Sequence, residues 1–141
     1  MMRKILPLVL LATICLAACN KATHKPGCPT NQVCTALFAT VNVAFVDKDG
    51  QIVNVKNVTI TNLRTDSAIV IDNITGPSIS PHIITIATDA NRQQFSTEGD
   101  NVRVVATDVV TNKTATAMFK ISGGCNCHVD KVAGPDKIVF E

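Results

Sequence analysis

The chain has 141 residues and a formal net charge of +2 at pH 7, from 13 basic and 11 acidic side chains. This length corresponds to one domain. The sequence contains no tryptophan and no tyrosine, and its basic residues form no run. It therefore lacks the stacking rings and the positive patch that are typical of nucleic-acid-binding proteins, and we expect no nucleic-acid partner.

Residues 1–18 have the order of a secretory signal peptide. Arg3 and Lys4 precede an apolar run from Ile5 to Leu16. This run is about twelve residues long, whereas a membrane-spanning helix needs roughly twenty. Loss of Arg3 and Lys4 with the signal would reduce the 13 basic side chains to 11, which equals the 11 acidic ones. We therefore expect an exported chain with a net charge near zero.

The end of this signal, Leu16-Ala17-Ala18-Cys19, resembles the lipobox of bacterial lipoproteins. The resemblance implies cleavage before Cys19, a diacylglycerol on its sulfur, and attachment to a membrane of the bacterial cell envelope through this lipid. Two or three acyl chains anchor a protein stably, whereas one chain binds only marginally. Asn20 follows, where Asp would retain a lipoprotein in the inner membrane under the enteric sorting pattern, and this favours the outer membrane. The alternative is an ordinary cleaved signal with a cysteine nearby.

Residues 19–33 form the expected lipidated tether, and residues 34–141 form the expected domain. Three stretches of the domain alternate apolar and polar residues, which predicts half-buried β-strands. The residues expected to face inward are Ala39, Val41, Val43 and Phe45 in the first stretch, Val102, Val104 and Ala106 in the second, and Ala115, Ala117, Phe119 and Ile121 in the third. The middle strands are expected at Ile52–Val53, Val58–Leu63, Ala68–Ile74 and His82–Ala87. No stretch of ten residues has a helical period.

Turn-forming residues at Asp47–Gly50 and Thr111–Lys113 separate the apolar runs. About seven short strands at this spacing predict an all-β fold, an antiparallel β-sandwich. Residues Gly99–Asp108, followed by Thr114–Phe119, resemble the last hairpin of bacterial immunoglobulin-like surface domains. This resemblance implies an immunoglobulin-like sandwich with a scaffold or adhesion role, and it carries no catalytic residues.

Besides Cys19, the exported chain has Cys28, Cys34, Cys125 and Cys127. The exported context is oxidising, so disulfides are the default expectation. A direct bridge between Cys125 and Cys127 would be strained, so we expect each of them to pair with Cys28 or Cys34 and tie the two ends of the domain together. The competing arrangement is a Cys28–Cys34 bridge. It would be needed if parallel first and last strands hold those ends apart.

A metal site is the alternative use of the same residues. Cys125, Cys127 and His128 offer two thiolates and an imidazole within four residues. One further thiolate, from Cys28 or Cys34, could complete a tetrahedral zinc or copper(I) site. Their spacing differs from that of a zinc knuckle.

The sequence has no nucleophile-elbow, paired-histidine or phosphate-loop motif. We therefore expect no catalytic residues, no enzymatic activity and no cofactor beyond the covalent lipid. The expected function is a lipid-anchored module that binds or scaffolds an envelope protein or glycan. The alternative is an envelope metal-binding or thiol-redox lipoprotein that uses the cysteine and histidine cluster.

Overall fold

A computed structural model describes residues 27–29, 31–71 and 83–141. The chain divides into a unit Met1–Asn31 and a compact unit Gln32–Glu141. The lipobox with Cys19, and His82 at the start of an expected strand, lie outside the described residues. Among the described residues, no helix is long and apolar enough to cross a membrane.

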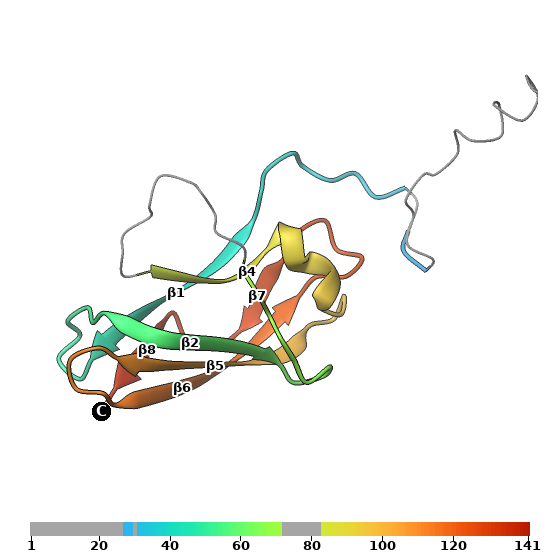
Figure 1. The fold of residues 1–141 in the computed structure, drawn as a ribbon. Helices are drawn as coiled ribbons and strands as arrows, with labels where there is room; N and C mark the ends of the chain where they lie inside the picture. The colour runs from blue at the N-terminus through green and yellow to red at the C-terminus, as the bar shows by residue number, and fades with distance from the viewer. Residues whose placement is uncertain (1–26, 30, 72–82) are drawn as a thin grey trace, which may run out of the picture. The chain divides into compact units, whose positions relative to one another are not determined.

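The second unit is an all-β sandwich of two sheets, as the sequence predicts (Figure 1). One sheet has the strand order β4-β1-β8, and the other has the order β3-β2-β5-β6-β7. The strands are β1 (Thr40–Asp47), β2 (Val55–Asn62), β3 (Ser67–Ala68), β4 (Ile83–Thr88), β5 (Asp100–Asp108), β6 (Thr114–Ser122), β7 (Asp130–Ala133) and β8 (Lys137–Phe140). A six-residue 3-10 helix, η2 (Asp89–Gln94), connects β4 to β5.

The order of neighbouring strands is that of an immunoglobulin-like sandwich. β1 pairs with β4 in one sheet, and β2, β5 and β6 are consecutive antiparallel neighbours in the other. These positions correspond to strands B and E, and to C, F and G, of such folds. β8 occupies the remaining side of β1, where strand A lies in those folds, and it runs parallel to β1. One pair in the sandwich is therefore parallel, because the last strand of the chain covers this edge.

The core lies between the sheets and is built from the alternating residues of the long strands. Val43 and Phe45 of β1, Val104 of β5 and Phe119 of β6 are each at most 2% exposed. The ring of Phe140 in β8 lies 6.1 Å from that of Phe45, between centroids. Every second side chain of these strands therefore points into the core, as expected for strands that have one face in solvent.

Three expectations about strand extent are wrong. Ile52–Val53 forms only an isolated bridge, from Ile52 to Val46, because the chain leaves this sheet to begin β2 in the other one. The expected strand Ala68–Ile74 is reduced to the two residues of β3, and residues from 72 onward lie outside the described part. β7 and β8 were not expected at all, because four residues are too few to establish a period.

The expected turn at Asp47–Gly50 is present. The Asp47 carboxylate accepts hydrogen bonds from the amides of Asp49 (2.9 Å) and Gln51 (2.8 Å). Gly50 has a φ of +79°, a conformation that glycine adopts without steric cost. The Asp47 carboxylate is thus used to stabilise a turn, and the chain returns alongside β1 after it.

We expect Phe119→Ala to lower the free energy of unfolding by about 3–5 kcal/mol, because it opens a cavity between the sheets. Met118 is the matched control, since it lies next in the chain but is 45% exposed. Met118→Ala should cost under about 1 kcal/mol. Urea unfolding of both variants with disulfides intact measures the difference, and equal losses would contradict the assigned facing of β6.

Candidate functional site

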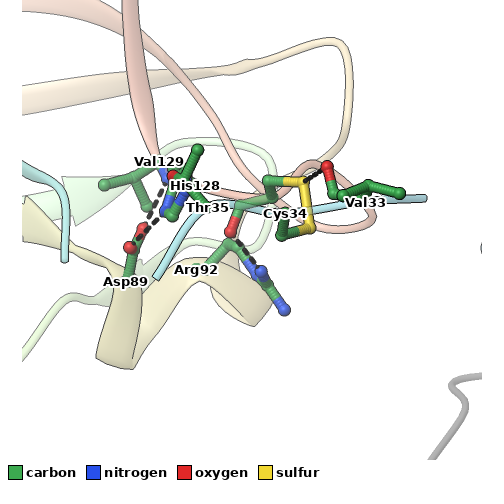
Figure 2. The surroundings of a disulfide bond; sticks show 8 residues. Val33, Cys34, Thr35, Asp89, Arg92, His128 and Val129 are labelled. Carbon is green, nitrogen blue, oxygen red and sulfur yellow. Dashed lines mark hydrogen bonds and ion pairs between the residues drawn. A yellow bond between two sulfur atoms is a disulfide. The ribbon is translucent and has the colours of Figure 1, made fainter. Parts of the chain in front are cut away.

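A disulfide fastens the segment before β1 to the connection between β6 and β7. Cys34 and Cys127 are bonded at an S–S distance of 2.04 Å, and their Cα atoms are 5.3 Å apart across 93 positions of sequence (Figure 2). Cys28 and Cys125 are disulfide-bonded as well. All four cysteines after the expected lipidation site are therefore oxidised, and Cys34–Cys127 is one of the pairings that the spacing favours.

This bond coexists with the parallel pairing that we expected to prevent it. β8 does run parallel to β1. Cys127, however, precedes both β7 and β8, and the sequence predicted no strand after it. It follows the end of β6, at the end of the sandwich where β1 begins. A Cys28–Cys34 bridge is consequently not formed, because Cys34 is already used.

Two glycines bring the β6–β7 connection into direct contact with η2. A Cβ on Gly123 would lie 2.4 Å from the carbonyl oxygen of Arg92, so only glycine fits there. Gly124 has a φ of +59° and donates its amide to the same oxygen at 2.9 Å. The Gly123 amide donates to the Ser96 carbonyl, also at 2.9 Å. This close approach sets the path of the chain as it reaches Cys127.

Beside the disulfide, a chain of hydrogen bonds makes a second link. The Nδ1 atom of His128 lies 2.6 Å from Oδ2 of Asp89, and its Nε2 atom lies 2.8 Å from the hydroxyl of Thr35 (Figure 2). The side chains of His128 and Asp89 are 27% and 14% exposed. Thr35 follows Cys34, and His128 follows Cys127. The same two segments are therefore joined by two adjacent links, a disulfide and a hydrogen bond.

Asp89 is the shared acceptor of this cluster. Besides His128, it accepts the backbone amides of Ala39 (2.9 Å) and Val129 (2.8 Å). Burial opposes ionisation of this carboxyl group. The hydrogen bonds from Ala39, His128 and Val129 outweigh burial and lower the pKa of Asp89 below its usual value. The carboxylate thus holds together the start of η2, the segment before β1 and the start of β7.

The order carboxylate, imidazole, hydroxyl also occurs in hydrolytic triads, where the hydroxyl attacks a carbonyl group held beside it. In this protein the three side chains join the start of η2, the segment before β1 and the β6–β7 connection, and the same carboxylate also accepts the amides of Ala39 and Val129. We interpret the contacts of Asp89, His128 and Thr35 as a structural link between these segments.

The same contacts bear on the metal alternative. No group of three or more metal-ligating side chains occurs within the described ranges. Both ring nitrogens of His128 are engaged, one by Asp89 and one by Thr35. Cys125 and Cys127 are in disulfides and offer no thiolate. A metal could use these residues only after the disulfides are reduced and the histidine is released.

Arg92 completes the cluster and, like Thr35 and Asp89, was not identified from the sequence. Its guanidinium donates to the carbonyl oxygen of Cys127. The only local signal was a capping box at the start of η2, in which Thr88 and Asn91 exchange backbone and side-chain hydrogen bonds. That signal locates η2. It does not pair Asp89 with a histidine 39 positions away.

A second buried carboxylate lies beyond the other end of η2. Asp100 is 4% exposed and accepts hydrogen bonds from Arg64 Nε, Asn62 Nδ2 and the Ser96 hydroxyl, each at 2.7 Å. Burial again opposes ionisation, but these hydrogen bonds and one from the Ser96 amide lower the pKa of Asp100 to about 2. Asn62 and Arg64, which Asp100 binds, also donate to the carbonyl oxygen of Gln94, so this carboxylate acts on the end of η2 through them.

Comparisons with protein-family models, with curated proteins and with solved structures find no match for this chain. The structure by itself defines the class: a disulfide-bonded immunoglobulin-like β-sandwich whose N-terminal segment is fastened to its β6–β7 connection.

Replacing Cys28, Cys34, Cys125 and Cys127 together with alanine should lower the free energy of unfolding by roughly 2–4 kcal/mol or more, because all four cysteines are disulfide-bonded and the denatured chain regains its conformational freedom only when these bonds are gone. Urea unfolding without reductant measures this loss. Reduced wild-type protein should be destabilised by a similar amount. Unchanged stability in the fourfold variant would contradict stabilisation of the fold by these disulfides.

Asp100→Asn should remove part of the acid sensitivity of the fold. Because the folded-state pKa lies below the unfolded one, this group stabilises the fold above about pH 4, and the effect is lost as pH falls toward 2. We expect the variant to lose about 2 kcal/mol at pH 7 and much less at pH 2.5. Urea unfolding at both pH values tests this, with the exposed Asp130→Asn as control. A loss that does not change with pH would contradict the assignment.

Proposed function

We propose that this protein is a lipid-anchored module of the bacterial cell envelope, attached to the outer membrane, which binds or scaffolds an envelope protein or glycan and catalyses no reaction. The lipobox ending at Cys19 and the oxidised cysteines support an exported location. The observation that carries the proposal is the Cys34–Cys127 bond, which fastens the sandwich to the segment that leads back to the anchor.

The position of this bond suits a tethered domain. β1 is the central strand of its sheet, with β4 on one side and β8 on the other. A force transmitted from the membrane along the chain reaches Cys28 and Cys34, which are both disulfide-bonded, before it reaches β1. The Cys34–Cys127 disulfide passes a force on this segment to the β6–β7 connection in the other sheet, so β1 is not pulled away from its neighbours. The module can therefore stay folded while its partner and its anchor are displaced relative to each other.

The anchor itself is tested by Cys19→Ala. Without the thiol, no diacylglycerol can be attached, so labelling with radioactive palmitate should disappear and the protein should move from the membrane fraction to the soluble fraction. Cys15→Ala, which changes a cysteine within the signal, is the matched control and should label like wild type. Undiminished labelling of the Cys19 variant would overturn the anchor.

The alternative function is thiol–disulfide exchange or metal binding at Cys125, Cys127 and His128. One observation favours exchange: Cys34 is exposed, so an external thiolate can reach its disulfide, form a mixed disulfide and release Cys127 as a thiolate. Thiol titration with and without reductant and chelator separates the functions. Free thiols with bound zinc or copper would favour the metal site, and rapid reduction by a redox partner would favour exchange.

A further inference from the structure

Three large apolar side chains are exposed in the segment that the disulfide fastens. Val33, Leu37 and Phe38 are 95%, 77% and 60% exposed. Exposed single apolar residues are common, but clusters of large ones mark interaction surfaces. These three fall within six consecutive residues, directly before β1, and we refer to them as the apolar edge.

The apolar edge is held in place. Cys34 is bonded to Cys127, and Thr35 contacts His128 at 2.8 Å. On the other side of Leu37 and Phe38, Ala39 is paired with Asp89 through two hydrogen bonds: its amide donates to the carboxylate, and its carbonyl oxygen accepts the Asp89 amide at 3.1 Å. The segment is thus secured before and after its exposed side chains. The contacts of Cys34, Thr35 and Ala39 therefore hold the backbone in a position that leaves these side chains exposed.

We propose that the apolar edge docks on the lipid bilayer, at the boundary between headgroups and acyl chains. This rests on the proposed anchor at Cys19. Val33 follows Cys19 by about fourteen residues, which span at most roughly 50 Å when fully extended. The residues between them include Lys21 and Lys25 and no acidic residue. A basic stretch of this kind is attracted to anionic headgroups, which brings the apolar edge to the membrane surface.

The opposite end of the sandwich supplies a matched control. Val110 is 84% exposed in the turn between β5 and β6. β5 begins at Asp100, beside η2, and reaches this turn at its other end. Val110 is therefore an equally exposed apolar residue that lies a full strand away from the apolar edge.

The absence of tryptophan from the chain allows a site-specific test. Phe38→Trp and Val110→Trp are each made in the exported full chain carrying Cys19→Ala, which has no lipid of its own. Vesicles of phosphatidylethanolamine and phosphatidylglycerol are then added. We expect a blue shift and an increase in tryptophan emission for Phe38→Trp and no change for Val110→Trp. Leu37→Ser with Phe38→Ser should lower vesicle partitioning by on the order of tenfold or more.

Unchanged Phe38→Trp emission, or equal shifts at both positions, would overturn bilayer docking. A blue shift that depends on protein concentration and needs no vesicles would also overturn it, and would indicate a second copy of the chain as the occupant. These outcomes are separate from failure of the anchor, because palmitate labelling at Cys19 reports the anchor and tryptophan emission reports the apolar edge.

Discussion

The bond between Cys34 and Cys127 is the constraint on which the arrangement of this end of the protein depends. It closes 93 positions of sequence, nearly the whole sandwich, into one loop. A loop of this length removes a large amount of conformational entropy from the unfolded chain. The same bond brings Thr35 and His128 side by side, so the hydrogen-bonded link forms between residues that are already close. The covalent contact thus makes the polar contacts less costly in entropy.

The disulfide alone would not fix the surrounding geometry. Gly123 and Gly124 allow the β6–β7 connection to lie against η2, where any side chain at Gly123 would collide with the Arg92 backbone. Asp89 fixes the start of η2 through its charged hydrogen bonds, and Asp100 binds Asn62 and Arg64, which donate to Gln94 at its end. Hydrogen bonds to ionised groups are stronger than neutral ones, and a short 3-10 helix has few internal contacts of its own. The helix consequently depends on the two carboxylates.

The sandwich separates the fastened end from the opposite end. The segment before β1, η2 and the β6–β7 connection gather where the chain enters the domain. The turns at Asp47–Gly50 and Thr111–Lys113, and the end of β8, lie at the other ends of the same strands. Because β8 runs parallel to β1, the end of β8 lies far from the start of β1. These turns are therefore presented away from the fastened end.

Sequence alone determined the features that depend on neighbouring residues. The alternation in β1, β5 and β6 predicted which side chains enter the core. This was possible because the two-residue period of a strand is set by neighbouring residues alone. The turn at Asp47–Gly50 followed from residue type in the same way, and the oxidised state of the cysteines was expected from the exported context that residues 1–18 predict.

Tertiary structure decided what depends on distant residues. β7 and β8 are too short to have a readable period and exist because β6 and β1 offer them free edges. The choice of Cys127 as the partner of Cys34 depended on the position of those two strands. The contacts of Asp89 with His128 and of His128 with Thr35 join segments 39 and 93 positions apart. No local pattern encodes such pairs, because folding of the two sheets brings them together.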